Sequence, residues 1–512
     1  MTIVRPLTGL TALALALALG IVPATRAAQA QATPDNFIVA VAEEPDTLDL
    51  TSTSHAPGGR ITLENITEGL WRTTTDGEVV PGLASFEASP DGMMITFHLR
   101  QDVVFHSGDP FTAEDVVFSH ERMTERAPQY ARRARNVDHL EIVDPYTVRM
   151  VFSRPDAGLL PARGFSIASK AYFDRVGEEE FTRHPVGTGP YEFVSYTPGS
   201  NMVLRRFDGY WGDAVQVENA TFRFVREAST RLAQLQTGEV GMTMDVPYTD
   251  VESLRSAGFG LEFLNAHPTV GIQFQTTNPD VPWHDPRVRQ AFAYAIDREA
   301  IIGGLLQGVP AVSEAVTEGE LGYDPALEFR AYDPAHARQL LADAGYPNGF
   351  DMPFYIWGGA FAGLRETAEA VVLYLQQVGI NADVQTLEAS QFLGMLREVS
   401  GSEDGVYVGI SAMPWANQSD PIEALTVAFY GRSPFAPYRN ADVDTLIAQA
   451  NTLLDPAERG PVLQQIFALM YEDAALVPLW NFVAVYAQAE GVEFTPTQRW
   501  FPVVQLRDVS FD

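Results

Sequence analysis

The chain of 512 residues contains no cysteine, and its only lysine is Lys170. Without cysteine it cannot form disulfides, a thiolate nucleophile, a cysteine-ligated zinc or iron–sulfur site, or a lipid-modified N-terminal cysteine. A phosphate-binding G-K-[ST] loop is also missing, because no other lysine exists to form one. These absences exclude thiol chemistry and nucleotide hydrolysis by that loop.

Positive charge is scarce as well. The chain has 34 Lys and Arg residues against 66 Asp and Glu residues, which gives a formal net charge of −32. A surface of this sign repels nucleic acids and anionic membranes. We therefore expect neither to be a partner of this protein.

Motifs of known catalytic sites do not occur in the sequence. The nine histidines form no H-E-x-x-H pattern, and no G-x-S-x-G motif is present. Adjacent acids such as Glu43 and Glu44 are typical of a solvated surface. The glycines Gly187 and Gly189 precede Pro190, which lacks an amide donor, so this segment indicates a rigid chain crossing rather than a dinucleotide loop. We expect no catalytic residue, no cofactor and no metal site.

The N-terminus has the pattern of a cleaved export signal. Arg5 precedes an apolar run from Leu7 to Val22, and small residues with A-x-A matches follow up to Ala32. The alternative is a single membrane anchor, although the run is short for a span and no later segment is long and apolar enough. Removal of residues 1–32 takes away two arginines and no acid, so the net charge changes from −32 to −34. This pattern predicts a periplasmic protein.

Strand and helix signals alternate along the mature chain. Ile95, Phe97 and Leu99 recur at period two, which predicts a half-buried strand. Thr112 and Asp115 have the spacing of a capping box at the start of a helix, and a hairpin is predicted around residues 144–145. Asp-Pro pairs predict the starts of three further helices, because Asp caps free amide groups and Pro suits the first helical position. These pairs are Asp285–Pro286, Asp333–Pro334 and Asp455–Pro456. Gly345 is expected to end the second of these helices, and the interleaving favours α/β lobes.

Several segments, in order and along nearly the whole mature chain, together carry a family resemblance. They are AEEPDTLDL, EGLWRTTTDGEVVPGLA, ITFHLRQDVVFHSGDPFTAEDVVFSHERM, HPVGTGPYEFVSYTPGSNMVLRRFDGYWG, TRLAQLQTGEVGM, DPRVRQAFAYAIDREAII and DPAHARQLLADAGYPNGF. The sequence resembles the extracytoplasmic solute-binding proteins of ABC importers in the oligopeptide, dipeptide and nickel family (family 5). Within it, the chain is most similar to the glutathione-binding branch.

The resemblance implies an α/β, two-lobed periplasmic-binding-protein fold of type II with an inserted domain and a ligand cleft between the lobes. The implied division is a signal at 1–32, lobe I at 33–65, 186–270 and 488–512, an inserted domain at 66–185, and lobe II at 271–487. It also implies hinge closure on a small solute and delivery to ABC permease subunits in the inner membrane, without catalysis or a direct membrane anchor. The chain is expected to be a monomer.

Dipeptide-binding relatives hold the peptide with an aspartate and an arginine. The place of the aspartate falls at Met413, with Asp420 the nearest acid, and Arg365 lies close to the place of the arginine. Aromatic side chains near both segments suit stacking against a ligand. The candidate ligand-binding residues are Trp357, Phe361, Arg365, Met413, Trp415, Asn417, Asp420 and His55. Each has a structural alternative: core packing for the aromatics, a surface position for Arg365, a helix cap for Asp420 and an exposed loop for His55.

The resemblance therefore predicts a binding protein for a peptide or peptide-like solute. An oligosaccharide, an opine-like compound or chelated nickel is an alternative ligand, because the family uses one fold for unlike solutes. Alternatives from other classes are a secreted hydrolase on a two-lobed scaffold and an adhesion or chaperone-like scaffold.

Overall fold

The computed structural model describes residues 32–52, 57–74, 78–157, 166–313, 316, 320–327, 330–358, 361–413, 420–497 and 503–512. All but the last residue of the predicted export signal lies outside these ranges. Within them, no helix is long and apolar enough to cross a membrane.

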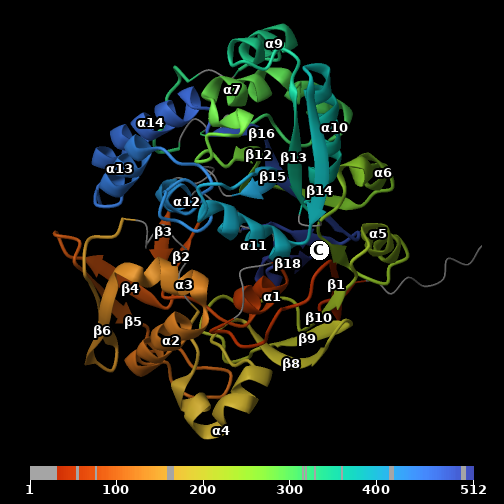
Figure 1. Ribbon diagram of the computed structural model, residues 1–512. Helices are drawn as coiled ribbons and strands as arrows, with labels where there is room; N and C mark the ends of the chain where they lie inside the picture. Colours follow the sequence, from red (N-terminus) through yellow and green to blue (C-terminus); the bar gives the residue numbers. More distant parts are fainter. Residues whose placement is uncertain are drawn as a thin grey trace, which may run out of the picture.

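A ten-stranded mixed sheet runs through the molecule (Figure 1). In the lower half of Figure 1, β1 pairs in parallel with β10 and β11; in the upper half, β13 pairs in parallel with β14 and β15. In sheet order the strands are β14 (Ile380–Leu387), β13 (Phe350–Trp357), β15 (Val408–Met413), β12 (Gly260–Phe274), β16 (Leu476–Gln488), β11 (Met242–Thr243), β1 (Phe37–Val41), β10 (Asn219–Phe224), β9 (Asn201–Arg206) and β8 (Tyr191–Thr197). We call β1 with β8–β11 the lower half and β13–β15 the upper half.

Two long antiparallel strands join the halves. β12 has 15 residues and β16 has 13, and they pair along most of their length with a register shift between Asn265 and Thr269. β16 pairs with β11 of the lower half near its end, whereas β12 pairs with β15 of the upper half over residues 269–274. The central strands are therefore shared, and each half adds its own parallel strands.

An inserted unit with its own hydrophobic core packs beside the lower half (Figure 1). It contains the antiparallel sheet β4 (Ala84–Ala88), β5 (Met94–Leu99), β7 (Thr147–Phe152) and β6 (Val137–Asp144), with α2 (Ala113–Arg126), α3 (Pro128–Arg133), η1 (Ala134–Asn136) and α4 (Lys170–Arg183). Ile95, Phe97 and Leu99 of β5 are buried, which confirms the predicted strand. β6 and β7 form the predicted hairpin, with Asp144 opposite Thr147.

The predicted helix caps are confirmed. Thr112 and Asp115 form a capping box at α2. The three Asp side chains of the Asp-Pro pairs accept hydrogen bonds from the first turns of α7 (Pro286–Ala295), α9 (Pro334–Asp343) and α14 (Pro456–Glu472). Gly345, just after α9, has a φ of 96°, the left-handed conformation in which glycine is favoured.

The remaining elements complete both halves. They are α1 (Pro57–Asn65), β2 (Trp71–Thr73), β3 (Val79–Pro81), α5 (Ala228–Gln236), η2 (Tyr248–Asp250), α6 (Val251–Ser256), η3 (Pro282–His284), α8 (Arg298–Gly304), α10 (Leu364–Gln377), α11 (Ala389–Ser400), α12 (Ile422–Ala428), α13 (Ala441–Ala450), β17 (Val492–Phe494), η4 (Leu506–Asp508) and β18 (Val509–Phe511). The segment at Gly187 crosses the chain just after α1, where a Cβ atom would lie 2.1 Å from the Ile66 carbonyl oxygen. The predicted crossing is confirmed.

Candidate ligand site at the boundary between the halves

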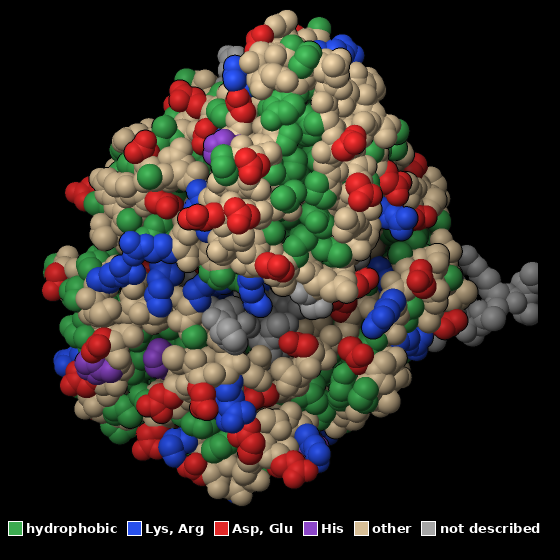
Figure 2. All heavy atoms as spheres, viewed as in Figure 1, with side chains coloured by type: hydrophobic (Ala, Val, Ile, Leu, Met, Phe, Trp, Pro, Cys, Tyr) green, Lys and Arg blue, Asp and Glu red, His purple; other side chains and the backbone are tan. Residues whose placement is uncertain are grey.

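The inserted unit and the upper half meet through α3 and α12. Arg133 Nε donates to Glu423 Oε1 at 2.5 Å, and the two side chains are 18% and 9% exposed. A second contact joins the Ala157 amide to the Asn451 carbonyl at 3.1 Å. Figure 2 shows Lys and Arg side chains gathered along the boundary between the halves, on a face that is otherwise rich in acids. The inserted unit and the upper half are therefore in contact here, through an ion pair and a backbone hydrogen bond.

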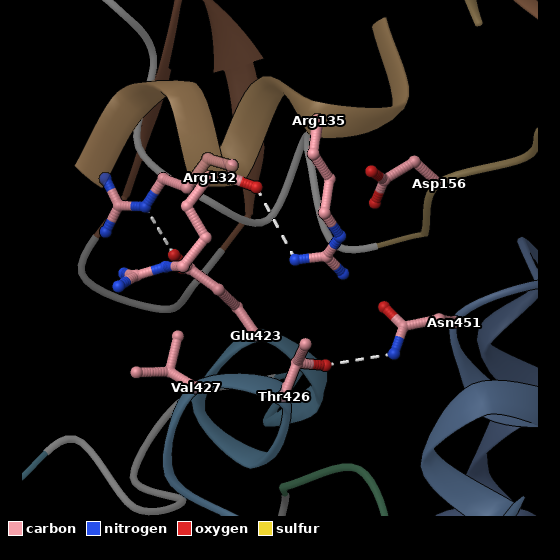
Figure 3. Close-up of a pocket in the computed structure, with 8 residues that line it drawn as sticks. Arg132, Arg135, Asp156, Glu423, Thr426, Val427 and Asn451 are labelled. Atoms are coloured by element: carbon pink, nitrogen blue, oxygen red, sulfur yellow. Dashed lines mark hydrogen bonds and ion pairs between the residues drawn. The ribbon is translucent and has the colours of Figure 1, made fainter. Parts of the chain in front are cut away.

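A polar pocket lies at this contact (Figure 3). Its lining residues are Arg132, Arg133, Arg135, Asp156, Glu423, Thr426, Val427 and Asn451. The Arg135 side chain extends from the inserted unit toward Thr426 and Asn451 of the upper half. Asn451 Nδ2 donates to Thr426 Oγ1 at 2.9 Å. The inserted unit and the upper half thus both contribute walls to the pocket.

Cations outnumber acids around this pocket. The guanidinium groups of Arg132 and Arg397 lie 5.2 and 5.0 Å from the centre of the Phe435 ring. Burial and, to a smaller extent, the nearby charges of Arg133, Arg135 and Arg397 together lower the pKa of Arg132 to about 10. Only Glu423 acts in the opposite direction. We call Arg132, Arg133, Arg135 and Arg397 the basic boundary.

Two acids of the lower half lie just beyond the C-terminal ends of two neighbouring strands. Glu43 and Asp245 each follow the last residue of a strand by two positions, and the strands β1 and β11 are parallel neighbours. Burial, and then the charge of Asp245, raises the pKa of Glu43; burial also raises the pKa of Asp245. The Glu43 side chain is still accessible to solvent. This pair can hold a ligand ammonium group.

Arg60 connects the basic boundary to this acidic pair. It is buried in α1, pairs with Glu64 at 3.4 Å, and has its pKa lowered to about 9 by burial, with a further contribution from Arg133. Tyr486 is near Arg60, and its own pKa is raised by burial and then by the charge of Asp245. The boundary is therefore electrically polarised, with positive charge toward the inserted unit and negative charge toward the ends of β1 and β11.

Two of the predicted ligand residues lie together. Trp357 ends β13 and stacks on Phe392, with ring centroids 5.4 Å apart, and Phe361 meets Trp357 edge-on at 5.9 Å. Phe361 also contacts Phe482 at 5.0 Å. The Trp357 Nε1 atom is buried and has no hydrogen-bond partner among the residues that the structure describes. Both rings are partly buried and pack against the hydrophobic core, so these contacts also match the core packing considered as the structural alternative.

Two other predicted residues lie elsewhere. Arg365 is in the first turn of α10, where its side chain is 78% exposed and pairs with Glu369 at 3.1 Å. Asp420 is buried, forms an ion pair with Arg459, and accepts a hydrogen bond from the Ile422 amide at 3.2 Å. These contacts match the structural alternatives considered for both residues, a surface position and a helix cap.

The structure does not describe the side chains of the remaining candidates. His55, Trp415 and Asn417 lie outside the described residues. Met413 is the last residue of β15 and pairs with Thr269 of β12, but only its backbone is described. Their roles stay predictions.

The charged residues of the boundary were missed by the sequence analysis. The three arginines within residues 132–135 are a usable signal, because cations are scarce in this chain. Glu43 and Glu44 remain accessible to solvent, as predicted, and the Glu44 carboxylate also accepts hydrogen bonds from the Tyr196 hydroxyl and the Gly199 amide at 2.6 and 2.7 Å. Adjacent acids gave no indication of these partners.

Comparison with known proteins shows the family. The model of the bacterial extracellular solute-binding proteins, family 5, matches residues 78–494. The glutathione-binding protein GsiB of Shigella dysenteriae serotype 1 is 29% identical over 488 residues, which cover 90% of this chain and 92% of the relative. The same protein of Escherichia coli strain K12 is similar to the same extent.

Solved structures share the fold. The protein AgaA of A. tumefaciens R10, in complex with agropinic acid, is 26% identical with a TM-score of 0.77, covering 93% of this chain and 99% of that one. A dipeptide-binding protein from Pseudoalteromonas sp. SM9913, in complex with Met-Leu, is 21% identical with a TM-score of 0.81, covering 93% and 100%. These matches confirm the predicted α/β, two-lobed fold. The chain belongs to the bacterial extracellular solute-binding proteins, family 5, and serves as the solute-binding component of an ABC importer.

Proposed function

We propose that the protein captures a short peptide or peptide-like solute in the periplasm, closes its two halves around it, and delivers it to permease subunits in the inner membrane. The main support is the similarity to GsiB, a protein named for glutathione binding, over 90% of this chain. The polarised boundary is a second support. A peptide carries an ammonium and a carboxylate, and the acidic pair and the basic boundary offer one partner for each.

An opine-like solute is a second candidate. It is favoured by AgaA, which was solved with agropinic acid and is 26% identical to this chain. Chelated nickel is a third candidate, because a nickel ion that arrives with its chelator needs no set of protein ligands.

Several finer points belong to this proposal. We propose a monomer that is exported by a cleaved signal, carries no membrane anchor and performs no catalysis. The division into lobe I, the inserted domain and lobe II at the boundaries given above is part of it. For the ligand contacts, Trp357 and Phe361 are the best supported of the predicted residues, because they form one aromatic wall.

Calorimetric titration of residues 33–512 tests the proposal. The solutes are glutathione, the peptides Met-Leu, Ala-Glu-Ala and Ala-Gln-Ala, agropinic acid and Ni²⁺ with histidine. Binding of glutathione or a peptide, together with a smaller radius of gyration in X-ray scattering, is expected. Binding of agropinic acid alone would select the opine-like candidate, and no binding of any solute would refute the transport role. Mass spectrometry of the titrated samples must recover each solute unchanged, because a cleaved product would indicate a hydrolase.

A further inference from the structure

The basic boundary carries more positive charge than its own acids neutralise. Glu423 Oε1 is engaged by Arg133 at 2.5 Å, and Asp156 Oδ2 accepts a hydrogen bond from Asn136 at 2.6 Å. Three arginines line the pocket with these two carboxylates, and Arg397 lies against the Phe435 ring that Arg132 also contacts. In a chain with 66 acids and 34 basic residues, a local surplus of cations is the reverse of the average composition.

Arg132 is the clearest case of a cation without a carboxylate. It forms no ion pair with any carboxylate in the described parts of the chain, and its charged end lies over the Phe435 ring. The guanidinium group of Arg397, in α11, contacts the same ring. A half-buried guanidinium normally pairs with an acid, whereas here the neighbouring charges are mostly of the same sign and add to the effect of burial in lowering the pKa of Arg132.

Arg135 adds a second guanidinium aimed into the same pocket. Its one hydrogen bond within the described residues runs from Nη1 to the Arg132 carbonyl at 3.5 Å, a long contact. Thr426 and Asn451 opposite it already use their donors on Ile422, on each other and on Ile447. The available donors of the pocket are therefore guanidinium groups, whose planar N–H pairs match a carboxylate.

We propose that this pocket between α3, η1 and α12 binds a carboxylate of the transported solute through Arg132 and Arg135. This inference rests on the proposed function and adds a recognition site on the inserted unit. A carboxylate held here also lies against α12 of the upper half, so it stabilises the closed arrangement as well as the bound solute.

The test compares charged and uncharged peptides on single variants. Ala-Glu-Ala and the C-terminal amide of Ala-Gln-Ala are titrated by calorimetry into the full mature chain, Arg132→Gln and Arg135→Gln. The wild type is expected to bind the carboxylate-rich peptide at least about tenfold more tightly, and each variant is expected to reduce that ratio to about threefold or less. The control is Arg183→Gln, which removes an exposed arginine of the same unit that pairs with Glu179 within α4, and it is expected to keep the ratio.

The outcomes separate the two levels of the argument. If the wild type binds peptides and both Arg132→Gln and Arg135→Gln keep its preference, the carboxylate site is refuted while the proposed function stands. If the wild type binds none of the peptides and no glutathione, the proposed function fails. Titration with sodium phosphate is a further arm: if phosphate binds with the same dependence on both arginines and does not compete with the peptide, the pocket is a free-anion site and the inference is refuted. Circular dichroism of each variant confirms folding, and Arg135, which is exposed, can be replaced without disturbing a core.

Discussion

The ion pair between Arg133 and Glu423 is the contact through which the structure can be tested most directly. It joins α3 of the inserted unit to α12 of the upper half, and it exists only while the halves are in contact. We consider three variants: Arg133→Gln, Glu423→Gln and the double variant. Glutamine keeps the length of each side chain approximately and removes its charge, so the cycle isolates the interaction between the charges.

The expected size follows from the geometry. Two unit charges 4 Å apart attract by about 4 kcal/mol at an effective dielectric constant of about 20. The pair is closer than this, but its side chains are only 18% and 9% exposed, so desolvation offsets much of the gain. We therefore expect a coupling free energy of about 1–3 kcal/mol. Each single variant should lower the free energy of unfolding by more than half of the effect of the double variant.

Urea unfolding, followed by tryptophan fluorescence and by circular dichroism, measures the cycle. The two signals must give one transition for the free energies to be comparable. The control pair is Arg183 with Glu179, which has a similar distance of 2.8 Å but side chains that are 69% and 79% exposed, and for which we expect a coupling below about 0.5 kcal/mol. X-ray scattering of the double variant should show a larger radius of gyration. Additive effects at Arg133 and Glu423, equal to those of the control pair, would refute the contact between the halves.

Three further predictions concern groups away from this contact. Arg122→Leu leaves the Asp49 side chain, which is 3% exposed, buried without its cation. In urea unfolding this variant should lower the free energy of unfolding by about 3–5 kcal/mol. The control Arg126→Leu removes an exposed partner of Glu178 and should lower it by less than about 1 kcal/mol. Asp245→Asn should raise the melting temperature at pH 8, because the raised pKa of Asp245 means that its ionised carboxylate destabilises the native state. This gain should vanish as the pH falls through that pKa. Asparagine also tolerates the left-handed backbone conformation of this residue, whose φ is 57°. His106 should titrate with a pKa of about 4 by NMR, since burial lowers its pKa. Its contribution to stability is complete above about pH 6.5 and is lost as the pH falls toward 4. An NMR pKa near 6.5 would contradict its burial.

Local structure was predictable because its causes lie within a few residues. The box formed by Thr112 and Asp115 spans one helical turn, and the Asp-Pro starts satisfy free amide groups at once. The strand at residues 94–99 shows its buried face directly in the alternation of its side chains. Such signals survive in any tertiary context, since they depend on hydrogen bonds and burial along a single segment.

The site was less predictable because its parts come together only in the folded chain. Arg133 and Glu423 are 290 residues apart, and no pattern in either segment indicates the other. The place of Arg365 shows the converse problem: its position after a strand-end tryptophan suited a carboxylate clamp, yet the first turn of α10 turns its side chain to solvent and to Glu369. Spacing locates a residue on an element, whereas packing decides which way it faces.

The net charge of −32 has to be interpreted locally as well. Charges on a protein surface are screened over about 8 Å at physiological ionic strength. A long polyanion such as a nucleic acid meets many patches at once and is repelled by the acidic average, so that exclusion still stands. A small anion samples only the groups within a few ångströms, and beside Arg132 those are chiefly arginines. A strongly acidic binding protein can therefore select an anionic solute, provided that its few cations are concentrated where the two halves meet.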